Sequence, residues 1–178
     1  TNNQPEERGD GLWYAQVEDI LGLREDRYFA SRFRNSDSFL TDVLVSKDGK
    51  VATATADVNY LGEWSMKCGT ECSIHLSAND AFMLLGQMGQ VLMYTSDGIT
   101  RDESHNMWLG KETIVTRKPI CTSEGFPIKV EVTRDFYMDK GQEGGVWHFA
   151  FMKANLGDVS FLIPEYNVGY QLPERLAL

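Results

Sequence analysis

The stretch SANDAFMLLGQMGQVLMYTSDG, Ser77 to Gly98, decides the fold because it reads as one long helix with an apolar surface. Ser77 can accept a hydrogen bond from the first helical turn, and Asp80, three residues later, completes an acidic form of the capping box. The Asp97-Gly98 pair is typical of a helix end, since glycine tolerates the left-handed conformation that closes a helix. We therefore predict a helix that begins after the Ser77 cap and ends at Gly98.

The predicted helix is apolar on nearly every side. No charged residue lies between Asp80 and Asp97, and only Gln87 and Gln90 interrupt the apolar surface. Leaving its large side chains in water would cost on the order of 1.5–3 kcal/mol for each. Their sum would exceed the roughly 5–15 kcal/mol of net stability that a domain has. The helix must therefore be covered by other parts of the protein.

The segments around the helix have the alternating pattern of β-strands. Asp48-Gly49 supplies a hairpin turn between two such segments, residues 39–46 and 51–60. Four further strand-like segments follow the helix. They span residues 107–118, 127–138, 146–154 and, with a weaker pattern, 159–164.

Strands on both sides of one apolar helix favour an α+β hot-dog fold, in which a long central apolar helix is wrapped by a curved antiparallel β-sheet. The alternative is an α+β sandwich whose helix is sealed between the sheet and another subunit. Residues 1–11 are polar, and we expect a flexible N-terminus there. Residues 12–178 then form a single hot-dog domain. Because such domains expose an edge strand, we expect a homodimer.

The charge balance excludes some classes of partner. Lys and Arg total 17 against 26 for Asp and Glu, which gives a net charge of -9. This argues against a nucleic-acid or anionic-membrane partner, because phosphates must be met by clustered cations. No apolar run reaches the roughly 20 residues that a membrane span requires. The 3 cysteines, an odd number, favour a reducing, cytoplasmic location over a disulfide framework.

The segment LGEWSMKCGTECSIHLSANDAFMLLGQMGQ, residues 61–90, resembles the avirulence protein D (AvrD) family. In that family a Trp-Ser segment leads into His-Leu-Ser and an Asp-Ala helix start. The matching residues are Trp64, Ser65, Lys67, His75, Leu76, Ser77, Asp80 and Ala81, and Met107 to Leu109 fits a strand that follows the helix. The resemblance implies a hot-dog fold and chemistry on acyl thioesters.

The AvrD family is linked to the making of acylated signalling compounds, the syringolides, from a β-ketoacyl thioester and a sugar-derived partner. It is related in style to butyrolactone synthases and hydroxyacyl-thioester dehydratases. We therefore expect an enzyme of specialised metabolism that condenses or dehydrates a β-ketoacyl or β-hydroxyacyl thioester. An acyl thioesterase is the nearest alternative, and a non-catalytic hydrophobic-ligand or interaction domain of a larger synthase is an alternative of another class. Coenzyme A or an acyl carrier protein would carry the acyl group, so we expect no other cofactor.

His75 and Asp80 are the candidate catalytic residues. His75 precedes the Ser77 cap, where helix N–H groups without intrahelical partners can bind a thioester carbonyl. His75 could then move a proton on or off the substrate, with Asp80 orienting it or acting as the base itself. The structural alternative is that Asp80 only completes the capping box and His75 only braces the loop through a hydrogen bond.

Trp64, Lys67, Ser77 and Gln87 are the candidate substrate-binding residues. Trp64 and Lys67 could line a tunnel mouth, where Lys67 would meet a phosphate of coenzyme A or of a carrier arm. Ser77 lies at the helix start that would receive the carbonyl. The enclosed amide of Gln87 needs partners, which a substrate or another strand could supply.

Two other histidine patterns have weaker interpretations. Cys68, Cys72 and His75 superficially resemble a zinc site, but a fourth ligand is not evident, and we expect no metal. His148 alternates with Trp147 and Phe149 and should face away from their apolar side. We expect it on the outer sheet face or in an interface.

Overall fold

The computed structural model describes residues 5–23, 36–60, 76–104, 106–120, 125–141, 144–158 and 160–176. The elements before the long helix are β1 (Glu6–Arg8), β2 (Gly11–Gln16), α1 (Glu18–Leu21), β3 (Ser36–Ser46) and β4 (Val51–Tyr60). The long helix is α3 (Ala78–Asp97), and the elements after it are η2 (Arg101–Glu103), β5 (Trp108–Glu112), β6 (Val115–Thr116), β7 (Phe126–Asp139), β8 (Val146–Leu156), β9 (Phe161–Gln171) and η3 (Glu174–Leu176).

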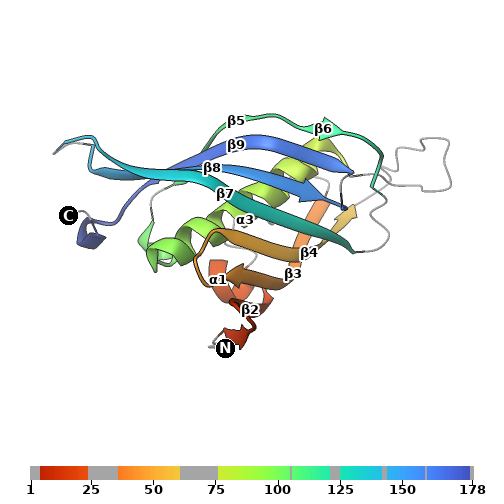
Figure 1. The fold of residues 1–178 in the computed structure, drawn as a ribbon, viewed down its shortest axis with the longest axis horizontal. Coiled ribbons are helices and arrows are strands. Elements are labelled where there is room, and N and C mark those ends of the chain that lie inside the picture. Colours follow the sequence, from red (N-terminus) through yellow and green to blue (C-terminus); the bar gives the residue numbers. More distant parts are fainter. Residues whose placement is uncertain are drawn as a thin grey trace.

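The strands form one antiparallel sheet, which has 9 strands within the described residues. Its order is β1-β2-β3-β4-β7-β8-β9-β5, and β6 also pairs with β9. The strands before α3 therefore join those after it where β4 pairs with β7 (Figure 1). The hairpin predicted at Asp48-Gly49 is confirmed, because β3 and β4 pair on either side of it.

Helix α3 begins and ends where the sequence predicts. The Ser77 hydroxyl accepts from the backbone N–H of Asp80, and the Asp80 carboxylate accepts from the backbone N–H of Ser77, so the capping box is complete. Gly98 has the left-handed conformation, with φ at 60°, and its N–H is directed at the last turn. Because 14 of the helix residues are buried, the expectation that the helix is covered is also confirmed.

The core lies between α3 and the sheet. Helix α3 packs against β3, β4, β7 and β8, and α1 also contacts it. On β4 the buried residues are Ala52, Ala54, Ala56 and Val58, which alternate along the strand. These small side chains let the bulky helix lie close to the sheet, because helix–sheet packing must fill the space between them without voids.

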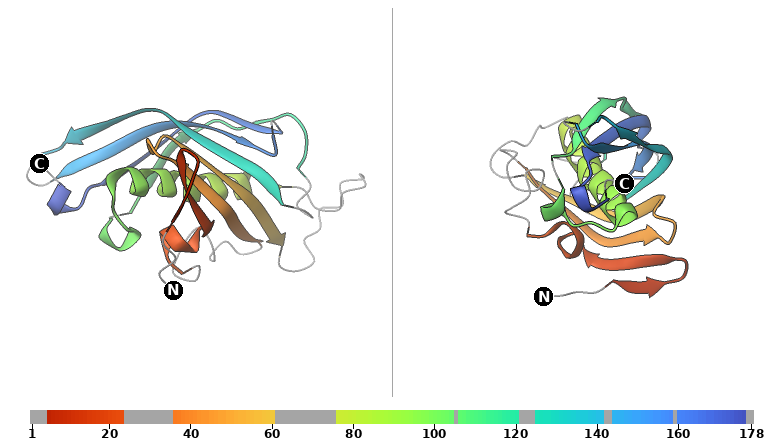
Figure 2. Two further views of the ribbon diagram at one scale, coloured as in Figure 1. Left: turned by 60° about the horizontal axis from the view of Figure 1, so that its bottom comes forward. Right: turned by 90° about the vertical axis from the view of Figure 1, so that its left-hand side faces the viewer.

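The hot-dog prediction is wrong. The protein is mainly a broad antiparallel sheet, and α3 covers one face of it (Figures 1 and 2) instead of forming a long central rod around which the sheet is organised. Burial requires only that the apolar helix be covered, and the sheet together with α1 can cover it without the helix being the centre of the fold.

One other expectation concerns the N-terminal segment. Residues 6–8, inside the segment expected to be flexible, form β1 and pair with β2. Strand β2 is followed by the short helix α1, which ends just before Gly22. Among the described helices, none is long and apolar enough to cross a membrane.

Candidate functional site

A buried carboxylate at the C-terminal end of α3 holds the candidate site together. Asp97 is the last residue of the helix, and its side chain is 4% exposed. Its Oδ1 accepts a hydrogen bond from the Tyr137 hydroxyl at 2.7 Å. Its Oδ2 accepts from Nδ1 of His148 at 2.7 Å and from the Tyr170 hydroxyl. Three donors from three neighbouring strands therefore converge on one helix end.

Asp97 is ionised although its position disfavours a negative charge. Burial raises the pKa of its carboxyl, and the C-terminal end of a helix dipole repels an anion. The hydrogen bonds from His148, Tyr170 and Tyr137 outweigh the burial, so the pKa of Asp97 is lowered overall. Burial and the nearby Asp97 raise the pKa of both tyrosines, which therefore keep their protons and act as donors.

His148 lies behind Asp97 on the buried side of β8. Its side chain is 1% exposed, and the ring of Tyr137 stacks on it with ring centroids 4.3 Å apart. The outer-face interpretation of His148 is therefore wrong. Trp147 and Phe149 are the residues on the outer face, where they stack on each other and Phe149 also stacks on Phe136. Alternation along the strand then places His148 inside.

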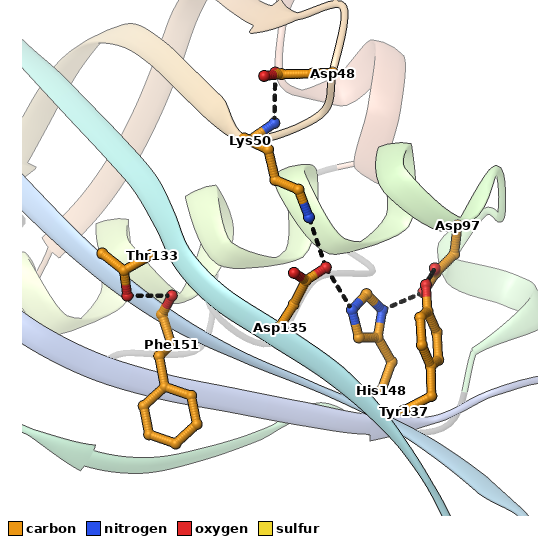
Figure 3. A network of polar contacts seen from close by, with 8 residues as sticks. All are labelled: Asp48, Lys50, Asp97, Thr133, Asp135, Tyr137, His148 and Phe151. Atoms are coloured by element: carbon orange, nitrogen blue, oxygen red, sulfur yellow. Dashed lines mark hydrogen bonds and ion pairs between the residues drawn. The ribbon is translucent and has the colours of Figure 1, made fainter.

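The network continues from His148 to a lysine on the β3–β4 turn. Nε2 of His148 lies 3.5 Å from Oδ2 of Asp135, and Nζ of Lys50 lies 2.6 Å from the same oxygen. Burial raises the pKa of Asp135, but Lys50 and His148 outweigh it and lower the pKa. Figure 3 shows the resulting chain of contacts from Lys50 through Asp135 and His148 to Asp97 and Tyr137.

A cavity of about 560 Å³ opens beside Asp97. Its lining residues are Ser96, Asp97, Tyr137, Asp139, Val146, Leu172 and Leu176. The wall thus combines two carboxylates and two hydroxyls with aliphatic side chains, and no cation is among these described lining residues. Such a wall favours a neutral or cationic ligand and disfavours a phosphate.

Several elements far apart in the sequence build this site. The Asp48-Gly49 turn lies against the end of α3, because a Cβ on Gly49 would be 3.5 Å from Cα of Ser96. Strands β7, β8 and β9 carry Tyr137, His148 and Tyr170 past the same helix end. The site therefore depends on the end of α3, the β3–β4 turn and three neighbouring strands.

A family model described as Pseudomonas avirulence D protein (AvrD) matches residues 12–88 and 79–159, which is more than half of the 178 residues. The chain belongs to the AvrD family. The resemblance found in residues 61–90 is thereby confirmed, and the AvrD family is linked to the biosynthesis of small molecules. Among curated proteins, no sequence matches the chain.

In this AvrD-family protein the predicted site lies at the other end of α3. Asp80 is 4% exposed, and its Oδ1 accepts from the Ser36 hydroxyl at 2.6 Å while Ser77 contacts its Oδ2. Asp80 and Asp97 are 17 positions apart, so about 26 Å of helix separates them. The two carboxylates cannot meet at one reacting group.

The other candidates from the sequence are dispersed. Nε2 of Gln87 donates to the Ser38 hydroxyl at 3.2 Å, so a strand supplies a partner to this buried amide. His75, Trp64 and Lys67 lie outside the described residues, and their roles stay predictions, as does that of Asp80. Within the part of the chain that the structure describes, no group of three or more His, Cys, Asp or Glu residues is placed to hold a metal ion.

Sequence reasoning missed Asp97 and His148 as site residues of this AvrD-family protein. The sequence held one signal for Asp97. An acidic residue in the last turn of a helix interacts unfavourably with the helix dipole, so its presence there indicates a compensating role. The signal for His148 was ambiguous. Its strand offers two alternating faces, and the aromatic one resembled a core face.

Proposed function

We propose that this protein is an enzyme of small-molecule biosynthesis in which Asp97 exchanges a proton with an acyl-thioester substrate bound in the neighbouring cavity. The reaction is the condensation or dehydration of a β-ketoacyl or β-hydroxyacyl thioester. One observation supports it above the others. A carboxylate is held ionised at a cavity wall, at a helix end that disfavours negative charge, by three hydrogen-bond donors.

Tyr137 gives the proposed site a way to respond to substrate. Its hydroxyl now donates to Oδ1 of Asp97, and both residues line the cavity. A substrate carbonyl can take over this hydrogen bond, and the hydroxyl then stabilises the negative charge that develops on the carbonyl oxygen. Asp97 loses one of its three donors at that moment. Its pKa rises as a result, which makes it a stronger base for the substrate proton.

The wall of the cavity supports entry of the acyl end of the substrate. Val146, Leu172 and Leu176 provide aliphatic contacts, and the carboxylates of Asp97 and Asp139 would repel a phosphate. The phosphates of coenzyme A or of a carrier arm would therefore lie outside. The acyl-thioester class itself rests on the resemblance of residues 61–90 to the AvrD family, and the homodimer stays a prediction.

The experiment is a panel of β-ketoacyl and β-hydroxyacyl thioesters incubated with the wild-type protein, with thiol release and product mass followed together. A product whose acyl part has changed in mass, and which is not the free acid formed by hydrolysis, supports condensation or dehydration. Tyr137→Phe is expected to lower kcat/KM by on the order of 10²–10³ while the protein stays folded. Full activity in Tyr137→Phe would remove the proposed role of its hydroxyl. Thiol release with only the free acid as product would indicate a thioesterase instead.

A second candidate function is a non-catalytic domain that binds a hydrophobic ligand. It is favoured by the aliphatic residues Val146, Leu172 and Leu176, which would hold an acyl chain without any chemistry. Saturable binding of acyl thioesters that raises the melting temperature, with no product after long incubation, would select this function over the enzyme.

A further inference from the structure

The buried ring of His148 has one nitrogen without a hydrogen bond. An ionised carboxylate only accepts, so Nδ1 must carry the hydrogen that is shared with Asp97. Nε2 is fully buried and makes no hydrogen bond among the described residues; it faces Oδ2 of Asp135 at 3.5 Å. An unsatisfied buried polar atom lowers stability by about 1–3 kcal/mol. The fold keeps Nε2 of His148 facing a carboxylate in spite of this loss, which indicates a functional role.

Asp135 and Lys50 connect this nitrogen to solvent. The Asp135 side chain is 25% exposed and that of Lys50 is 39% exposed, whereas that of His148 is 1% exposed. Neither Asp135 nor Lys50 lines the cavity. The contacts in Figure 3 therefore lead from the cavity wall at Asp97 to the surface without passing through the cavity.

A substrate in the cavity covers the open side of Asp97 and separates it from bulk water. We propose that the chain Lys50–Asp135–His148 is the path by which Asp97 exchanges protons with solvent on the side away from the cavity. Asp135 passes the proton to His148, and Lys50 is a positioning residue that holds the Asp135 carboxylate at 2.6 Å. The inference rests on the proposed function, since it takes Asp97 to be the group that exchanges a proton with substrate.

The path balances as a transfer of one proton. A proton from solvent passes by way of the Asp135 carboxylate to Nε2 of His148. The imidazolium then gives its Nδ1 proton to Asp97, which delivers one proton to the substrate. Each step breaks one O–H or N–H bond and forms another, and His148 is left with its hydrogen on Nε2. The reverse sequence, which removes a proton from the substrate, restores the first tautomer.

The other titratable groups against the imidazole do not compete with this path. Tyr137 stacks on the ring, and Tyr170 lies beside it with ring centroids 6.2 Å apart. Both hydroxyls donate to Asp97, and each keeps its proton. Asp135 is therefore the group that can exchange a proton with Nε2 among the described contacts of His148.

The test measures exchange of the His148 ring N–H with water by nuclear magnetic resonance on the full chain labelled with ¹⁵N-histidine. The chain has 3 histidines, and the signal of His148 is the one lost in His148→Gln. We expect Asp135→Asn to slow this exchange on the order of tenfold, because a positioned proton-transfer group is removed. Asp135→Ser is measured in the same way if the asparagine variant does not fold.

Glu131→Gln is the matched control. Glu131 is also a β7 carboxylate paired with a lysine, Lys153 at 2.8 Å, but it does not contact His148. Its variant should leave the exchange rate unchanged. Unchanged exchange in a folded Asp135 variant would overturn the path, as would equal slowing in Glu131→Gln. Because this measurement needs no turnover, its failure is distinct from a failure of the acyl-thioester assay.

Discussion

Replacing Asp97 by asparagine tests whether its charge supports the fold as the hydrogen bonds indicate. The substitution keeps the size of the side chain but turns three charge-assisted hydrogen bonds into neutral or opposed ones. A hydrogen bond to a charged group contributes about 1 kcal/mol more than a neutral one, so the loss totals about 3 kcal/mol. Removing an anion from a helix C-terminus stabilises the fold by about 0.5 kcal/mol. The expected loss in the free energy of unfolding is therefore about 2–3 kcal/mol.

The difference in the free energy of unfolding between wild type and Asp97→Asn should depend on pH in a definite direction. The pKa of the Asp97 carboxyl is lower in the folded protein than the value of about 3.9 in an unfolded chain. Ionised Asp97 therefore stabilises the fold above about pH 4, and this contribution is lost as the pH falls through the folded-state pKa. The difference between wild type and Asp97→Asn should be constant near neutral pH and shrink below about pH 4.

Urea unfolding followed by circular dichroism over a series of pH values measures both effects. Asp102→Asn is the control, because Asp102 is an exposed acidic residue five positions further along the chain. It should change the free energy of unfolding by less than about 0.5 kcal/mol. A variant Asp97→Asn as stable as wild type at neutral pH would refute the reasoning. A difference that persists undiminished in acid would refute the assigned charge state.

Three further changes test other parts of the structure, each by urea unfolding. Ser77→Ala removes the helix cap and should lower the free energy of unfolding by about 1 kcal/mol. An unchanged urea midpoint would contradict a stabilising role of the cap. Gly169→Ala places a Cβ 2.5 Å from Cδ1 of Phe149 and should cost about 1–3 kcal/mol, whereas tolerance would mean that the ring moves freely. Tyr166→Phe removes a buried hydroxyl that has no hydrogen bond among the described residues, and it should raise the free energy of unfolding by about 1 kcal/mol. A lower free energy of unfolding would mean that the hydroxyl has a hydrogen-bond partner.

The helix could be predicted closely from the sequence because its signals are local. The Ser77 cap, the acidic residue at Asp80 and the left-handed Gly98 each act within one turn of the chain. The Asp48-Gly49 hairpin was predictable for the same reason. How the helix meets the sheet was not, because burial requires only that apolar surface be covered and leaves the covering element open.

The inner face of β8 could not be assigned because two alternating sets compete. Trp147, Phe149 and Phe151 are large and apolar, yet they lie on the outer face, where Lys140 packs over Trp147 and Arg134 packs over Phe151. The inner set holds no aromatic hydrocarbon ring; beside His148 it consists of Ala150, Met152, Ala154 and Leu156. His148 belongs to that inner set, and only the contacts with Asp97 from a distant helix end reveal it.

The central proposal places acid–base chemistry at the C-terminal end of α3, and a pair of matched variants tests it most directly. Asp97→Asn and Asp80→Asn each remove one buried carboxylate, at opposite ends of the same helix. Under conditions where both are fully folded, kcat/KM for the acyl thioester turned over by wild type is measured for each. Asp97→Asn should lower it by on the order of 10²–10⁴, and Asp80→Asn should leave it close to wild type. Activity retained in Asp97→Asn but lost in Asp80→Asn would contradict the proposal and move the chemistry to the other end of the helix.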